Sequence, residues 1–339
     1  FVIGVYFFPL LGGWLADRYF GKYNTVFWLS LVYCLGHACL AIFEDNVNGF
    51  YFGLFLIALG SGGIKPLVAS FVGDQFDQTN KDKAKVVFDA FYWIINFGSF
   101  FASLLMPLLL RDYGPAWAFG VPGILMFIAT MVFWSGKKKY VHVPPAPANP
   151  HSFMRVAKSA LLARQPGQGR PGLNLALLGA AGALASLAMA AQWGFVIAAC
   201  TALVLLMAFG GMGTSMQLDR ARGLHPDDAV DGVRAVLRIL IVFALVTPFW
   251  SLFDQKASTW IVQANTMTTQ VNLLGWTFDV IPAQMQALNP LLVMLLIPLN
   301  NIALFPLMRK MGIEPTPLRR MTAGIALSAA AWIVVGNLQ

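Results

Sequence analysis

The sequence has few charged residues, few cysteines and few histidines, and each shortage excludes a class of protein. Charged side chains make up 11% of the 339 residues and hydrophobic ones 58%, against about 25% and about 45–50% in soluble domains. A soluble globular protein of this length needs more polar surface to cover its core. The three cysteines are scattered within apolar runs, which favours neither a disulfide framework nor a zinc site.

The four histidines are also scattered, and three of them lie in or beside expected loops. A membrane-embedded enzyme would need His, Asp or Glu clustered at catalytic spacing, which this sequence does not have. We therefore expect no enzymatic activity, no metal site and no catalytic residues.

What the sequence has in abundance is long apolar runs. Each bilayer crossing takes about 20 apolar residues, and breakers such as Gly114 and Gly194 separate neighbouring runs. The predicted class is therefore an all-α polytopic membrane protein with about ten membrane helices. The runs fall at residues 1–16, 25–43, 50–73, 86–110, 115–135, 173–191, 194–215, 235–254, 284–308 and 318–337.

The positions of the basic residues support this threading. A net charge of +8 could suggest nucleic acid as a partner. However, all Lys and Arg residues except Lys65, Arg111 and Lys256 fall in alternate connections between the runs. Because Lys and Arg concentrate in cytoplasmic loops, the excess charge belongs to the inner face of a lipid bilayer. We expect no nucleic-acid partner.

Two connections are longer than turns. Residues 136–172 begin with three lysines and continue through a Pro-rich stretch at 144–150, which predicts a polar cytoplasmic linker. Residues 255–283 are mixed in character and predict an external loop with little regular structure. Because Phe1 already lies within an apolar run, we expect the chain to be an internal piece of a longer protein.

Lys65 stands out because it lies well inside the run 50–73, beside Pro66. A charge at that depth costs about 2.5–3.5 kcal/mol on insertion scales. A lysine that snorkels from a helix end is the alternative, but Lys65 is far from either end. It is therefore the first functional candidate, facing a polar pathway, and it needs a carboxylate partner or a neutral state. The glycines at 60–63 and Pro66 predict a break in regular packing there.

A second motif joins the first two runs. Gly12-Gly13-Trp14-Leu15-Ala16-Asp17-Arg18 is followed by a Gly-Lys turn at 21–22. Asp17 lies at the membrane edge with Arg18 just beyond, where a carboxylate can hold a neighbouring helix N-terminus and keep the cytoplasmic side closed. An ordinary basic turn is the alternative. The motif resembles the signature loop of the major facilitator superfamily.

Two further motifs place polar side chains one helical turn apart. Tyr92 and Asn96, in Phe-Tyr-Trp-Ile-Ile-Asn-Phe-Gly-Ser at 91–99, share one helix face. Trp250 and Asp254 share a face at the end of the run 235–254. The first pair could instead hold helices together. Asp254 could exchange a proton with a cavity or lie exposed at the outer membrane edge.

These motifs, with Gly-Gly-Ile-Lys-Pro at 62–66 and Leu-Asn-Pro-Leu at 288–291, closely resemble the proton-dependent oligopeptide transporter (POT/PTR) family of that superfamily. The resemblance implies the major facilitator fold, truncated to family helices two to nine. Its expected parts are an N-terminal half at 1–135, the linker at 136–172, the extra two-helix insertion of bacterial members at 173–215 and an incomplete C-terminal half at 216–339. It also implies a multi-pass protein of the bacterial inner membrane that functions as a monomer.

The resemblance further implies a symporter that imports di- and tripeptides by rocker-switch alternating access, with the proton as coupling ion and no cofactor. A family member that carries nitrate or another small solute, or a non-transporting membrane receptor, is the alternative. The family's Glu-x-x-Glu-Arg motif in the first helix and its glutamate in the tenth have no counterpart here. Their absence fits truncation, and without them the chain lacks the family's main proton carriers.

The resemblance gives each candidate residue in the first half a role. Lys65 matches the cavity lysine that receives the peptide carboxylate or couples to a carboxylate across the cavity. Tyr6 matches a tyrosine that lines the same cavity. Tyr92 and Asn96 match side chains that hydrogen-bond the peptide backbone and termini.

The remaining candidates belong to the second half and to the gates. Trp250 matches a wall of a side-chain pocket, and Asn289 matches a group that holds the amino-terminal end of the peptide. Asp254 falls where members carry an acid of the outer gate. Asp17 and Arg18 are the expected residues of the cytoplasmic gate.

Overall fold

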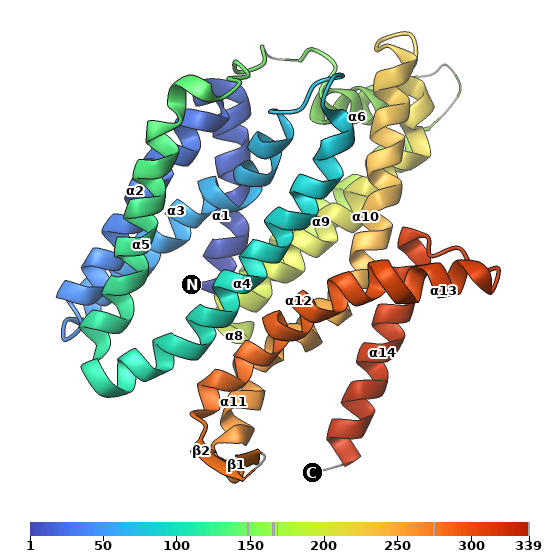
Figure 1. Ribbon diagram of the computed structural model, residues 1–339. Helices are drawn as coiled ribbons and strands as arrows, with labels where there is room; N and C mark the ends of the chain where they lie inside the picture. The colour runs from blue at the N-terminus through green and yellow to red at the C-terminus, as the bar shows by residue number, and fades with distance from the viewer. Residues whose placement is uncertain (148, 165–166, 168, 274, 338–339) are drawn as a thin grey trace. The chain divides into compact units, whose positions relative to one another are not determined.

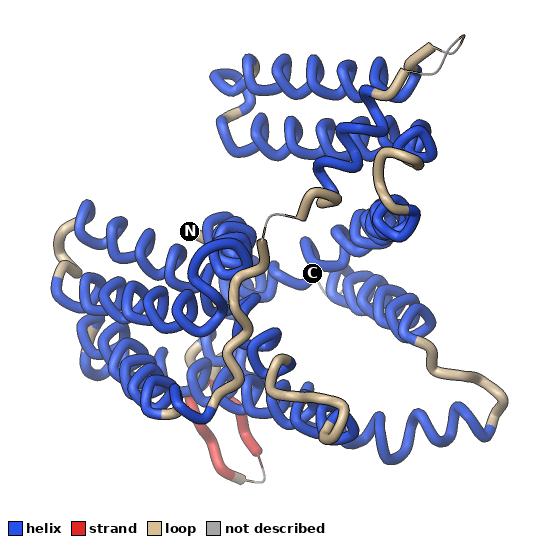
Figure 2. Tube along the Cα trace, turned by 90° about the horizontal axis from the view of Figure 1, so that it is seen from above, coloured by secondary structure: helices blue, strands red, loops and turns tan. Residues whose placement is uncertain are grey.

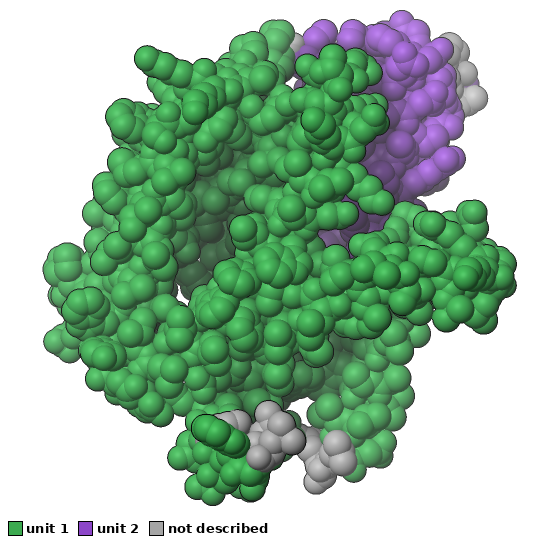
Figure 3. Space-filling view, in the orientation of Figure 1, with its two compact units in different colours: residues 1–147, 251–339 green, residues 148–250 purple. Residues whose placement is uncertain are grey.

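The computed structural model describes residues 1–147, 149–164, 167, 169–273 and 275–337 (Figure 1). Apart from one two-stranded hairpin, the regular elements in these residues are helices (Figure 2). Residues 148, 165, 166 and 168 of the predicted linker lie outside the described residues. Two compact units are present, residues 1–147 with 251–339, and residues 148–250 (Figure 3).

Nine helical stretches in the described residues are long and apolar enough to cross a membrane. The first, Ile3–Ile42, contains two α-helices separated by a π-helical turn at Ala16–Phe20, and the second α-helix begins at Gly21, where φ is 74°. Glycine reaches this left-handed conformation without steric cost, so the chain can turn there. The nine stretches therefore correspond to the ten predicted apolar runs. The predicted class of all-α polytopic membrane protein is confirmed.

The first unit begins with a group of long helices. α2 packs on α3 and α5, and α1 also packs on α3. The side chain of Asn46 accepts hydrogen bonds from the backbone N–H of Asn48 and Gly49, which caps α3. The elements are α1 (Val2–Leu15), the π-helical turn η1 (Ala16–Phe20), α2 (Gly21–Ile42), α3 (Val47–Gly73), α4 (Lys81–Tyr113), α5 (Pro115–Ser135) and the 3-10 turn η2 (Lys137–Lys139).

The glycine-rich segment of α3 differs from the prediction. α3 stays helical through Pro66, and the glycines at 60–63 are buried. A Cβ on Gly62 would lie 2.5 Å from the Cβ of Phe8 in α1, and one on Gly60 would lie 2.7 Å from the Leu29 carbonyl in α2. The expected break in packing was wrong. The absent side chains instead let three helices approach closely.

The second part of this unit, residues 251–339, contains shorter elements. The prediction of little regular structure at 255–283 was wrong, because η4, α11 and an antiparallel hairpin lie there. The hairpin pairs Gln270 with Asp279 and Leu273 with Trp276. The elements are η4 (Gln255–Ala257), α11 (Thr259–Ala264), β1 (Gln270–Leu273), β2 (Trp276–Asp279), η5 (Pro282–Ala287), α12 (Leu288–Leu299), η6 (Asn300–Leu304), α13 (Phe305–Lys310) and α14 (Pro317–Asn337).

In the second unit α7 packs on α9, and the short amphipathic helix α6 packs on α9 and η3 and shares a buried core with the start of α10. Its buried core contains Val156 and Ala160 of α6, Leu218 of η3, and Val230 and Leu237 of α10. The sequence analysis did not predict α6, which lies in the expected linker. The elements are α6 (Phe153–Leu162), α7 (Pro171–Ala188), α8 (Ala190–Trp193), α9 (Phe195–Gln217), η3 (Leu218–Ala221) and α10 (Asp227–Asp254).

Candidate functional site

The structure brings two of the predicted site residues together in the first unit. The Nζ of Lys65 on α3 lies 5.1 Å from the centre of the Tyr6 ring on α1, within the range of a cation–π contact. The close approach of α1 to α3 at Gly62 and Phe8 makes this contact possible. No carboxylate in the described residues forms an ion pair with Lys65. The ammonium group therefore has an aromatic neighbour and remains available to an anion.

Tyr92 and Asn96 lie one turn apart on α4, as the sequence predicts. The Asn96 side-chain amide donates to the Tyr92 carbonyl at 2.8 Å, which fixes the amide along the helix face. None of the residues of α4 is buried within the described chain, and the Tyr92 ring is exposed. Both side chains thus lie on one face of α4, and their role in peptide binding stays a prediction.

Asn289, at the start of α12, accepts a hydrogen bond from Lys256 Nζ at 3.0 Å. The same ammonium group lies 3.6 Å from the centre of the Phe253 ring. The sequence analysis missed this pairing, although Lys256 was one of the three basic residues away from the inner face. Asp254 lies two residues earlier and is exposed.

Trp250 belongs to the second unit, near the end of α10. Its ring contacts Phe249 edge-on, with the two ring centres 5.5 Å apart. Half of its surface, 51%, is exposed. Its role as a pocket wall stays a prediction.

At the inner membrane edge the observed ion pair is not one that the sequence analysis named. Lys22 Nζ contacts the two carboxylate oxygens of Asp74 at 2.8 and 2.7 Å, joining the start of α2 to the end of α3. Asp17 and Arg18 lie exposed on the π-helical turn. The Asp17 carbonyl accepts a hydrogen bond from the backbone N–H of Ala146 at 2.9 Å. The gating role of the Asp17 carboxylate stays a prediction.

The start of the linker is held at this same edge. The Gln75 side chain forms two hydrogen bonds with the backbone of Val141, accepting from its N–H at 2.9 Å and donating to its carbonyl at 3.2 Å. Tyr140 stacks on Phe133, with the ring centres 5.3 Å apart. The linker thus begins as an ordered strap across the inner ends of α2, α3 and α5.

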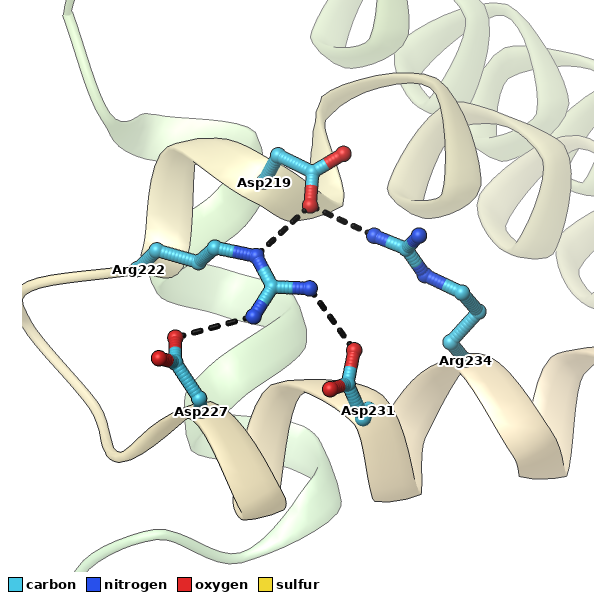
Figure 4. Close-up of polar contacts among 5 residues, drawn as sticks. All are labelled: Asp219, Arg222, Asp227, Asp231 and Arg234. Carbon is cyan, nitrogen blue, oxygen red and sulfur yellow. Dashed lines mark hydrogen bonds and ion pairs between the residues drawn. The ribbon is translucent and has the colours of Figure 1, made fainter.

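A second ionic cluster lies in the loop between η3 and α10 (Figure 4). The Arg222 guanidinium donates to Asp219, Asp227 and Asp231 at 2.9, 2.8 and 2.7 Å, and Arg234 also donates to Asp219. The hydrogen bond to Asp219, with those to Asp227 and Asp231, holds the pKa of Arg222 above its ordinary value. The cluster ties the loop to the first turns of α10.

Across the described ranges, no group of three or more His, Cys, Asp or Glu residues is placed to hold a metal ion. Two of the histidines that are scattered in the sequence do meet in the second unit, where His225 lies 2.9 Å from His151 (Nδ1 to Nδ1) and 2.8 Å from Ser159 (Nε2 to Oγ).

Comparison with known proteins places the chain in a family. The model of the family PTR2, described as "POT family", matches residues 23–339. The crystal structure of an auto inhibited POT family peptide transporter is 66% identical, with a TM-score of 0.88, and the match covers 99% of this chain and 65% of that one. The in meso crystal structure of the POT family transporter PepTSo is 64% identical, with a TM-score of 0.90, over 100% of this chain and 66% of that one.

Curated relatives are more distant and much longer. Solute carrier family 15 member 2 of Rattus norvegicus is 34% identical over 348 residues, which cover 98% of this chain and 42% of the relative. The chain thus spans about two fifths of the length of such relatives. The family match covers most of the chain, and the likeness to the two crystal structures extends over all of its helices. The chain therefore belongs to the POT family, a family of multi-pass membrane transporters and not of enzymes.

Proposed function

We propose that the full-length protein that contains this chain is a proton-coupled symporter for di- and tripeptides. The observation that carries the proposal is the position of Lys65, on Tyr6 and without an ion-pair partner in the described residues. A lysine at this depth of a membrane helix has an unfavourable free energy of insertion, so its presence indicates a functional site. The names of the similar proteins, which include peptide transporter, agree with this use.

The chemistry of the side chains fits a short peptide better than a larger or apolar solute. A peptide has a constant backbone with a charge at each end, and its side chains vary. Lys65 offers a cation for the carboxylate end, while Tyr92 and Asn96 offer hydrogen-bonding groups for the backbone. Tyr6 offers an aromatic wall that accepts varied side chains without demanding one shape.

A contact between distant parts of the first unit supports alternating access. Gln284 of η5 donates to the Leu104 carbonyl of α4 at 3.0 Å, and α4 also packs on α12. The basic residues place the start of α4 inside, so Leu104 lies toward its outer end. Contacts of this kind close the outer side, and in a rocker switch they break when the site opens outward.

The first alternative is a different solute. Nitrate would also bind a cation, but it would make no use of the paired hydrogen-bonding face on α4. The second alternative is a receptor that binds peptide without moving it. We place both behind the peptide symporter, and the experiment below separates them.

The test is uptake by the full-length protein reconstituted in liposomes. A proton gradient directed inward should drive accumulation of labelled alanyl-alanine above its outside concentration. An excess of unlabelled dipeptide should compete, and nitrate should not. Competition by nitrate would favour the first alternative, and binding without accumulation would favour the second.

A further inference from the structure

The second unit contains a groove of about 800 Å³, and none of the candidate peptide-site residues lines it. α6 forms one wall, α9 the floor and α10 the other wall. Apolar side chains line most of it, among them Phe153 and Leu161 of α6, Leu206 and Met207 of α9, and Leu240 of α10. The volume lies within the range of roughly 300–1,000 Å³ that is usual for sites of small organic ligands.

The floor of the groove is open because α9 has two glycines there. A Cβ built on Gly210 would meet no atom within 4 Å, and one built on Gly211 would only touch Leu237 at 3.6 Å. Two residues further along, the opposite holds, because a Cβ on Gly213 would collide with the carbonyl of Gly172 in α7. α9 is therefore tightly packed on one face and leaves space on the other.

Two cations line this apolar space. Arg155 and Lys158 lie three residues apart on α6, on neighbouring positions of one helix side. Both are exposed, and within the described part of the second unit neither forms an ion pair. Arg222 and Arg234, by contrast, are held by carboxylates. A ligand of the groove should therefore combine an anionic group with an apolar body.

The depth of the groove matches one leaflet of a bilayer. α6 belongs to the segment that the basic residues place on the cytoplasmic side, and α9 runs away from that side from Gln217 toward Phe195. The groove follows α9 from Thr214 to Leu206, about 12 Å at 1.5 Å per residue. Half of a hydrocarbon core about 30 Å thick is of similar depth.

We propose that this groove binds an anionic phospholipid of the inner leaflet. Arg155 and Lys158 hold its phosphate, and one acyl chain lies over Gly210 between α6, α9 and α10. Free phosphate would leave the apolar floor uncovered. A zwitterionic lipid would place its own positively charged group near Arg155 and Lys158, which would repel it.

The test measures lipid binding to the purified full-length protein in a neutral detergent. Native mass spectrometry and thermal unfolding compare phosphatidylglycerol with phosphatidylcholine of the same chains, and with inorganic phosphate. We expect phosphatidylglycerol to bind at least about tenfold more tightly than phosphatidylcholine and to raise the melting temperature. Phosphate alone should do neither. Equal binding of the two lipids, or equal stabilisation by phosphate, would overturn the proposal.

Variants locate the site. Arg155→Gln with Lys158→Gln should remove the preference for phosphatidylglycerol, while Arg164→Gln, just beyond the end of α6 and outside the groove, should keep it. Gly210→Leu should weaken binding of the lipid with both cations in place, and it decides the question if the double variant fails to fold. If Arg164→Gln lost the preference for phosphatidylglycerol to the same extent, general surface charge would explain the binding. If Gly210→Leu bound the lipid fully, the groove would not be the site.

Discussion

Lys22 and Lys65 lie in the same group of helices, but their surroundings are opposite. Lys22, at the inner membrane edge, contacts both carboxylate oxygens of Asp74. Lys65 precedes Asp74 by nine residues on α3, about 13 Å deeper in the membrane, and contacts the ring of Tyr6 instead. One ammonium group has its counter-charge within the fold, and the other does not.

The difference shows where a ligand can gain binding energy. A charge that is already paired gains little from a new anion, because the old contact must first be given up. A charge at depth without an ionic partner has lost part of its hydration and has not recovered it. A carboxylate that arrives there forms a charge-assisted bond in surroundings of low dielectric constant. The unpaired charge near the membrane centre is therefore suited to binding a ligand, and the paired charge at the membrane edge is suited to stabilising the fold.

The largest effect should follow from removing the unpaired charge. Lys65→Gln in the full-length protein should abolish proton-driven accumulation of dipeptide. A hydrogen bond to a charged group contributes about 1.5–3 kcal/mol, so equilibrium binding of dipeptide should weaken roughly 10- to 150-fold. Uptake into liposomes and binding to detergent-solubilised protein measure the two effects.

Lys22→Gln is the matched control for this change, since it removes the same charge from the paired site. It should retain peptide binding within about twofold, because the Lys22–Asp74 pair lies outside the proposed site. Accumulation by Lys65→Gln at the level of the unaltered protein would refute the role of Lys65. A greater loss of binding in Lys22→Gln would reverse the comparison.

A smaller but still large effect should come from the packing that brings Tyr6 to Lys65. Gly62→Ala places a Cβ 2.5 Å from the Cβ of Phe8, so α1 must move away from α3. Overpacking of this kind costs about 1–3 kcal/mol. Gly98→Ala on α4 is the control, because its Cβ would meet nothing within 4 Å. Thermal unfolding should show a lower melting temperature for Gly62→Ala alone, and equal values would argue against a tight α1–α3 contact.

Much of this architecture could be predicted from the sequence, because a membrane span is encoded locally. About 20 consecutive apolar residues and an alternation of basic loops are sufficient to place each run. Pairs of residues one helical turn apart could be predicted equally well, and the Asn96 side-chain amide does donate to the Tyr92 carbonyl. The family resemblance added Tyr6 as a residue that lines the peptide cavity, and the structure shows its contact with Lys65.

What the sequence did not reveal depends on partners far along the chain. Lys22 and Asp74 are 52 residues apart, and Gln284 and Leu104 are 180 residues apart. The helix α6 was missed because it is short and lies among Pro-rich and charged residues. The glycines at 60–63 were read as a break in packing, because their contacts on α1 and α2 appear only in three dimensions.

The paired site should show a moderate coupling between its two members. The Lys22 and Asp74 side chains are 21% and 19% exposed, between a surface pair and a buried one. A double-mutant cycle with Lys22→Gln and Asp74→Asn should therefore give about 1 kcal/mol of coupling in the free energy of unfolding. The pair Lys22 with Asp77 is a control, because the Asp77 carboxylate accepts from the backbone N–H and the hydroxyl of Thr79 instead. Strong coupling to Asp77 would show that the ion pair is not specific.

The smallest effect should come from the exposed cluster around Arg222. Its carboxylate partners are 57–72% exposed, so solvent screens the attraction. Arg222→Gln should therefore lower the melting temperature less than Lys22→Gln does.

The pKa of Arg222 is raised in the folded state by its bonds to Asp219, Asp227 and Asp231. A raised pKa gives stability that is fully present below the ordinary value and is lost only as the pH rises through the folded one. The difference between Arg222→Gln and the unaltered protein should therefore stay constant between about pH 6 and pH 8. A difference that changes across this interval would mean that a further titrating group, besides Arg222 and its three carboxylate partners, contributes to the cluster.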